Sequence, residues 1–163
     1  MNHYSFRVAA ALALSTAFFS TFAQTPLTVK VACLSVSRAP EPLGDREGHS
    51  LQIAESTCRI EGGPLDGAVG NISGIYEWNG PNAVGLAAGQ GVYRKPGVHA
   101  AWINTDHKLA LTMVDGRPVG ASFNGRGRFL LVTGSAAVLS GKPYYFVGKT
   151  TGPGQFVFDL TME

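Results

Sequence analysis

The chain of 163 residues is long enough for one domain with a buried core. Its formal net charge of +2 is too small to indicate nucleic acid or an anionic membrane as a general partner. The chain contains 21 glycines, and aromatic and aliphatic residues recur along it. This composition is typical of short strands joined by tight turns and excludes a disordered chain.

Residues 1–23 have the pattern of a signal peptide. Arg7 gives them a cationic start, an apolar run of about 15 residues follows, and Ala23 ends a small-residue boundary. We therefore predict cleavage before Gln24 and an exported protein, periplasmic or extracellular. The alternative is a membrane anchor, but a spanning helix needs about 20 apolar residues, so we expect no stable membrane insertion after cleavage. Arg7 is the only charged residue of this leader, and its removal lowers the net charge from +2 to +1.

Residues 24–163 are predicted to form a single all-β domain of nine or ten strands. Glycine interrupts every window with a helical period, whereas apolar and polar residues alternate in many short segments. One sheet of this length tends to curl, which favours a single antiparallel β-barrel of about 8–10 strands; a β-sandwich is the alternative. The segments with strand patterning are 27–37, 50–60, 68–78, 83–94, 98–104, 109–114, 117–123, 126–133, 143–149 and 155–161. Ser140-Gly141 separates a further short stretch, 136–139, from the segment at 143–149.

Several local signals separate these segments. Residues 39–45 include two prolines, which lack a backbone donor, and are expected to form a loop. Asp115-Gly116 is the clearest hairpin turn, because both residues tolerate the positive φ that a type I′ turn requires. The Asn-Thr-Asp-His-Lys stretch at 104–108 is interpreted as a turn, and Asn124-Gly125 repeats the hairpin signal.

Cys33 and Cys58 are the only cysteines, and both follow the predicted leader. In an oxidising compartment two cysteines usually pair, and pairing the strands at 27–37 and 50–60 would bring these two close. A redox pair or a metal site is the alternative, but the spacing fits neither Cys-x-x-Cys nor a Cys-His ligand pattern. We predict a structural disulfide.

Catalytic candidates are sparse. His49, His99 and His107 have no metal-ligand spacing, so we predict no metal and no cofactor. No Gly-x-Ser-x-Gly nucleophile elbow is present. One hypothesis makes His99 a general base oriented by Glu77 or Asp115; the alternative is that all three histidines are surface or strand-end residues.

A cationic cluster is the strongest candidate for ligand recognition. Arg126 and Arg128 are expected to point to one side of their strand, and Arg117 precedes them, so an anionic group could be held in bidentate fashion. A solvated barrel rim is the alternative. Aromatic residues could line a cavity in the barrel mouth or could simply form the core. The aromatic candidates are Tyr76, Trp78 and Trp102.

Three classes of function remain open. The first is an exported binding protein that holds a small apolar or anionic ligand in the barrel mouth. The second is a cofactor-independent isomerase, cyclase or hydrolase, so enzyme activity is left undecided. The third is a protein-binding envelope component or enzyme inhibitor that uses an exposed loop such as 41–48 or 62–67. The expected partners are therefore a small molecule or a protein, and not a nucleic acid.

Overall fold

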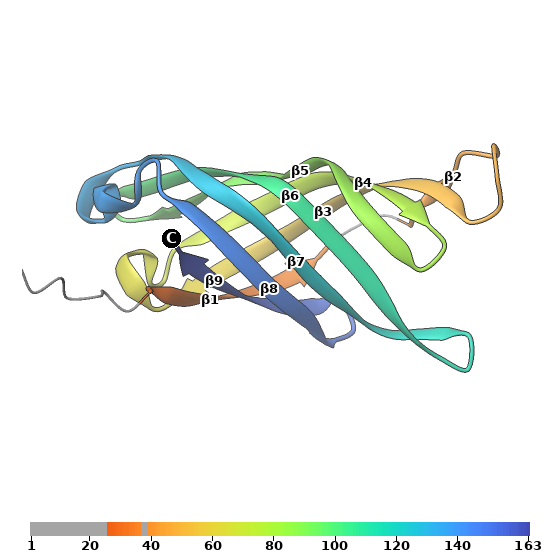
Figure 1. Cartoon of the computed structure of the whole chain (residues 1–163). Helices are drawn as coiled ribbons and strands as arrows, with labels where there is room; N and C mark the ends of the chain where they lie inside the picture. Colours follow the sequence, from red (N-terminus) through yellow and green to blue (C-terminus); the bar gives the residue numbers. More distant parts are fainter. Residues whose placement is uncertain (1–25, 37–38) are drawn as a thin grey trace, which may run out of the picture.

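The computed structural model describes residues 26–36 and 39–163, and this part of the chain is almost entirely β-structure (Figure 1). The predicted leader lies outside the described residues. The elements are β1 (Thr28–Ser35), β2 (Glu41–Pro42), β3 (His49–Glu61), η1 (Gly63–Leu65), β4 (Val69–Asn79), β5 (Asn82–Lys95), β6 (Val98–Val114), β7 (Arg117–Val132), η2 (Gly134–Leu139), β8 (Pro143–Gly152) and β9 (Gln155–Met162). Elements η1 and η2 are short 3-10 helices.

The strands close into an antiparallel ring, so the predicted all-β barrel is confirmed. The order in the sheet is β1-β9-β8-β7-β6-β5-β4-β3-β2, and β1 also pairs with β3. The β1–β3 pairing joins the two sides of the sheet and leaves the two-residue β2 outside the eight-strand ring. Every pairing is antiparallel. Six of the eight ring pairings join strands that are consecutive in the chain, and the other two are β1–β3 and β1–β9.

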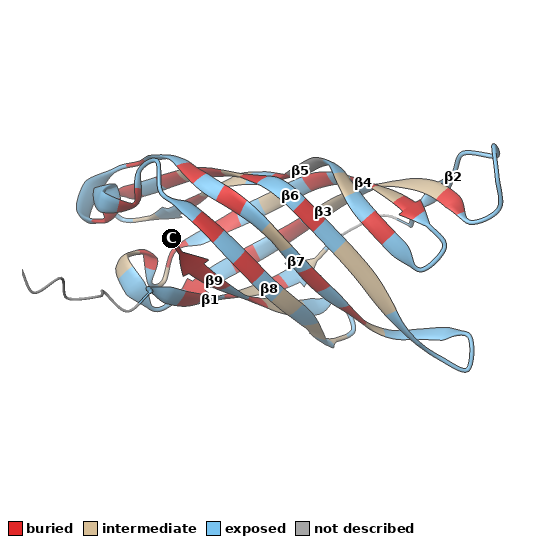
Figure 2. Cartoon of the chain, viewed as in Figure 1, coloured by how far each residue is buried: buried red, intermediate tan, exposed pale blue. Residues whose placement is uncertain are grey.

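One end of the barrel is closed by its own side chains. Elements η1 and η2 lie against each other at this end, on the left in Figure 1. Leu65 of η1 and Ala136 and Leu139 of η2 are buried there, as are the inward residues at the adjoining strand ends. Figure 2 shows buried positions alternating with exposed ones along the strands of the ring, as a barrel with a filled interior requires.

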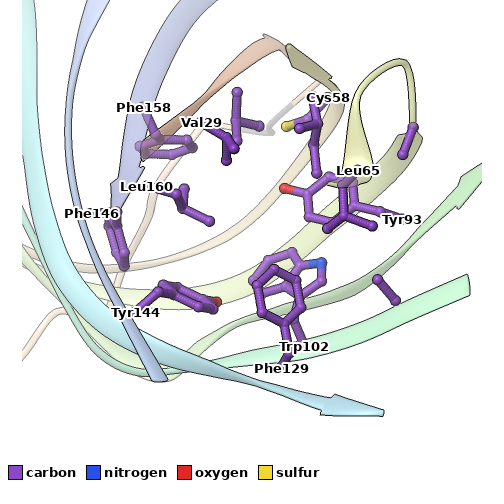
Figure 3. Packing of buried hydrophobic residues seen from close by; sticks show 14 of the residues in the cluster. Val29, Cys58, Leu65, Tyr93, Trp102, Phe129, Tyr144, Phe146, Phe158 and Leu160 are labelled. Carbon is purple, nitrogen blue, oxygen red and sulfur yellow. The ribbon is translucent and has the colours of Figure 1, made fainter. Parts of the chain in front are cut away.

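Next to the closed end, the middle of the barrel is filled by aromatic side chains. Tyr93 and Trp102 stack with ring centroids 5.6 Å apart, and Phe129 and Tyr144 pack at 5.3 Å (Figure 3). Phe129 is 1 % exposed and is among the most buried large side chains of the described residues. This part of the barrel is therefore a packed core and not a channel.

The other end of the barrel is open because the ring does not extend to it. The last β1–β3 pair is Ser35 with Ser56, and the last β7–β8 pair is Ser122 with Lys149. Beyond these pairs β3 to β7 continue as a five-stranded sheet whose inner face carries Tyr76, Trp78 and Ala83. The wall between the start of β3 and the β8–β9 hairpin is consequently interrupted (Figure 1).

Two predicted breaks are absent. The stretch at 104–108 and Asn124-Gly125 are not turns: β6 and β7 run through them as strands of 17 and 16 residues. Asn124 pairs with Lys108 and Gly125 with His107. Long-range pairing between β6 and β7 thus overrides local turn chemistry that favours chain reversal.

Two further expectations were wrong. Residues 41–42 form β2 although Pro42 lacks a donor, because an edge strand needs hydrogen bonds on one side only. Residues 136–139 belong to η2, where Ala136 and Leu139 pack against the barrel end instead of alternating across a sheet. By contrast, Asp115-Gly116 forms the expected hairpin turn, with φ of 49° and 73°.

The predicted disulfide is confirmed. Cys33 and Cys58 are direct partners in the β1–β3 register and are bonded to each other. They lie two residues from the last pair of this strand junction, Ser35 with Ser56. The bond therefore fastens the ring near its open end.

Candidate functional site

The open end contains a cavity of about 250 Å³ inside the barrel. Its walls come from seven of the eight ring strands and from both sides of the interrupted wall. Most of the lining is apolar and includes Ile72, Leu109, Phe123, Phe156 and Phe158. An apolar cavity with a few converging polar groups is the usual form of a small-molecule site.

A second hollow lies on the outer surface and has a larger volume, about 440 Å³. It is a groove over β3 and β4, lined by Leu51, Ile53 and Ile75 and flanked by Glu41 and Glu55. No buried polar group without a partner adjoins it among the described residues. We therefore place the candidate site in the interior cavity, where such a group is found.

His107 reaches the cavity because β6 contains a bulge. Asn104 pairs with Gly127 and Asp106 pairs with Arg126, so Thr105 is an extra residue on β6. The bulge reverses the alternation: Asn104 is buried, Thr105 and Asp106 are both exposed, and His107 is buried again. Without the extra residue, His107 would point to the outside of the barrel.

His107 is paired on one side only. Its Nδ1 lies 2.9 Å from the hydroxyl of Tyr76, and both residues are buried. Its Nε2 has no hydrogen-bond partner among the described residues. Burial lowers the pKa of His107 from 6.5 to about 4, although the charge of Asp106 acts in the opposite direction. Burial also raises the pKa of Tyr76 to about 12, so both groups are uncharged at neutral pH.

Two other polar groups of the cavity are oriented by neighbours. The Tyr144 hydroxyl donates to Oδ1 of Asn104 at 2.9 Å. The indole of Trp78 donates to Oε1 of Gln52 at 3.0 Å. Both amide oxygens therefore already act as acceptors, and these contacts fix how each amide is turned toward the cavity.

A charged cluster lies at the rim of the open end. His49 Nδ1 is 2.5 Å from Asp45, and its Nε2 is 2.8 Å from Glu77. Arg46 contacts Asp45, Glu77 and Asn79. The hydrogen bond to Asp45, followed by that to Glu77, raises the pKa of His49 above its ordinary value. This cluster ties the β2–β3 loop to the end of β4 and engages its histidine on both sides.

His107 is expected to make the protein less stable in mild acid. The unfolded chain binds a proton at this histidine near pH 6.5, whereas the folded chain binds it only near pH 4. The free energy of unfolding should therefore fall by about 2 kcal/mol at this site between pH 7 and pH 5. His49 acts with the opposite sign, because its raised pKa contributes stability that is lost as the pH rises.

Urea unfolding at several pH values checks this expectation. In H107L the free energy of unfolding should fall by about 2 kcal/mol less between pH 7 and pH 5 than in the wild type. His49 contributes equally to both proteins, so the difference between them reports His107 alone. NMR titration should show His49 titrating above pH 6.5 and His107 uncharged at pH 5. An H107L curve parallel to that of the wild type would contradict the burial of an uncharged imidazole.

The catalytic candidates from the sequence lie far apart. His99 pairs with Arg94, which pairs with Val69 at the start of β4, whereas Glu77 lies eight residues further along that strand, roughly 26 Å away. Asp115 lies in the hairpin turn at the opposite end of β6 from His99. His99 is exposed, and Glu77 is engaged by His49.

The predicted ligand-binding residues divide into two groups. Arg126 and Arg128 do lie on one side of β7, but on the outer face of the barrel, and Arg117 is exposed at the far end of that strand. The aromatic candidates are all buried inside. Tyr76 lines the cavity, Trp78 extends its inner face, and Trp102 lies deeper, beside a space of about 20 Å³.

Sequence reasoning missed His107 and Asn104. Their stretch was interpreted as a turn, which placed His107 at the surface. The signal that could have identified them is a change of phase: the inward residues are Val98, Ala100 and Trp102 before the bulge, but Leu109 and Leu111 after it. An alternation that changes from even to odd positions indicates an inserted residue.

The described part of the chain holds no group of three or more His, Cys, Asp or Glu side chains arranged to bind a metal ion. The same residues contain no helix long and apolar enough to cross a membrane. The disulfide is consistent with an exported protein.

No protein-family model matches this chain, and comparison with curated proteins and with solved structures gives no significant match. The geometry of the cavity therefore carries the functional argument alone.

Proposed function

We propose that this protein is an exported binding protein that holds a small, mostly apolar molecule in the barrel cavity. The observation that carries the proposal is the contrast between the two ends: one is filled with side chains, while the other encloses an apolar cavity of about 250 Å³. A cavity of about 150 Å³ binds benzene, so by proportion this one fits a ligand of about ten non-hydrogen atoms.

The lining favours an uncharged ligand. Among the described residues that line the cavity there is no lysine, arginine, aspartate or glutamate. Transfer of a charged group from water into such a site is unfavourable unless an opposite charge pairs with it. Arg126 and Arg128 point to the outside of the barrel, so neither is placed to supply that opposite charge.

Export is the second part of the proposal. The disulfide supports it, because such bonds persist in oxidising compartments. Expression with the native leader should yield an exported chain that begins at Gln24. N-terminal sequencing and intact mass measure this directly, and a retained leader or a reduced cysteine pair would contradict it.

Binding can be tested with tetralin, an uncharged hydrocarbon of suitable size. We expect a dissociation constant on the order of 0.1 mM by NMR titration, with shifts centred on Phe123 and Leu109. Ala54→Phe, which adds a ring to the cavity wall, should abolish binding. Ile53→Phe adds the same ring at the adjacent exposed position and should leave it intact. No saturable binding to the wild type would refute the proposal.

A cofactor-independent enzyme is the second candidate, and the His107–Tyr76 pair favours it. An uncharged imidazole beside an apolar cavity can accept or deliver a proton, as isomerases and cyclases require. A turnover screen with uncharged substrates of about ten non-hydrogen atoms would test this candidate. It requires an activity that is lost in H107L and retained in H99A.

A further inference from the structure

The hydrogen-bonding pattern of the cavity indicates which chemical group its ligand carries. This inference rests on the proposed function, because it assumes that a small molecule occupies the cavity. It begins with the histidine–tyrosine pair, whose geometry determines where the imidazole proton lies.

Tyr76 fixes the tautomer of His107. The phenol is the better donor of the two groups and the imidazole nitrogen the better acceptor, so the hydroxyl donates to Nδ1. The reverse arrangement would leave the hydroxyl proton of Tyr76, a residue 6 % exposed, without the acceptor that it has now. Nε2 of His107 therefore carries a hydrogen and is a donor.

That donor is unsatisfied within the described part of the protein. His107 lines the cavity and is 5 % exposed, and its Nε2 has no partner among the described residues. A buried donor without a partner is unfavourable, so the great majority in native proteins are paired. Nε2 itself is almost wholly covered by neighbouring side chains. We propose that the ligand is an uncharged carbonyl compound whose oxygen displaces this covering and accepts a hydrogen bond from Nε2–H of His107.

A carbonyl fits this site better than other oxygen groups do. A carboxylate would bring a charge into a lining whose described residues include no cation. A hydroxyl would bring a proton that itself needs an acceptor, and the amide oxygens of Asn104 and Gln52 have at most one lone pair left after accepting from Tyr144 and Trp78. A ketone, ester or tertiary amide oxygen only accepts and adds no unsatisfied donor. The depressed pKa of His107 keeps the imidazole uncharged, in agreement with an uncharged ligand.

The experiment compares two probes that differ by one group. Tetralin and 1-tetralone have the same ring skeleton, and only the second carries a carbonyl. Dissociation constants for both would be measured by NMR titration of the wild type and of H107L/Y76F. The double variant removes both members of the pair, so neither partner is left unsatisfied, and circular dichroism would confirm its fold.

We expect the preference for ketone over hydrocarbon, expressed as the ratio of the two dissociation constants, to be about tenfold greater in the wild type than in H107L/Y76F. The ¹⁵N resonances should show a protonated Nε2 in the free wild type and a shift of that resonance on adding 1-tetralone but not tetralin. Y76F should raise the fraction of the other tautomer, which a purely structural role for Tyr76 would not do.

The outcomes separate the two proposals. If both probes bind but their ratio is the same in the double variant, the carbonyl inference is wrong while the cavity remains a binding site. An Nε2 that is unprotonated in the free protein would also overturn the inference. If neither probe binds to the wild type, the proposed binding function itself fails.

Discussion

Replacing Gly125 with alanine is expected to destabilise the protein by at least about 3 kcal/mol, because the added methyl group has no room. Gly125 faces His107 across the β6–β7 pairing. A Cβ at this position would overlap the carbonyl oxygen of Asp106 and would lie 2.6 Å from Cζ of Phe146. Asp106 belongs to the bulge that turns His107 inward, so the substitution should also disturb the cavity.

Gly152→Ala supplies the matched control for this prediction. It lies in β8, and the nearest atom to an added Cβ is 3.8 Å away, which is an ordinary contact. Urea unfolding should show a change within about 0.5 kcal/mol for this variant. The ¹⁵N shifts of His107 should change in G125A and not in G152A. If G125A lowers the free energy of unfolding by less than about 1 kcal/mol, the bulge can shift at little cost. The position of His107 would then not be fixed by this packing.

The confirmed predictions are those that local sequence determines. Alternation predicts a strand at 68–78, which the structure shows as β4 at Val69–Asn79, and the Asp115-Gly116 turn follows from the positive φ that these two residues tolerate. The cysteine pairing followed from two neighbouring strands and the rarity of free cysteine in an oxidising compartment. For the strand and the turn the physical cause lies within a few residues of the feature. The disulfide joins positions 25 residues apart and could be predicted because the chain has only two cysteines.

The cavity could not be derived in this way because its causes lie far apart in the chain. The bulge at Thr105 depends on the register between β6 and β7. The open end depends on where pairing stops between β1 and β3 and between β7 and β8. The same limitation explains the interpretation of His107 as a surface residue and of Arg126 as part of the barrel mouth. Register is set by many weak contacts across the sheet, and a shift of one residue moves a side chain to the opposite face.

Breaking the disulfide is expected to lower the free energy of unfolding by about 3 kcal/mol, since the bond closes a loop of 25 residues in the unfolded chain. The bond also has a local role. Ser35 and Ser56, which line the cavity, are the last β1–β3 pair, and beyond them the barrel wall is interrupted. We call the β1–β3 pairing the seam of the barrel. Without the bond the end of the seam at Ser35 and Ser56 should open more readily, so reduction should weaken tetralin binding as well as stability.

Two forms of the protein distinguish the covalent bond from the packing of its sulfur atoms. The reduced wild type keeps both sulfurs, whereas C33A/C58A removes them from positions that are only 4 % and 1 % exposed. Both forms should lose the contribution of the loop closure, and the double variant should lose more because it leaves space in the core. Hydrogen exchange should become faster in β1 and in the second half of β3 before other strands are affected. If reduction leaves both urea unfolding and exchange unchanged, strand pairing alone holds the seam, and the open end is rigid without its covalent link.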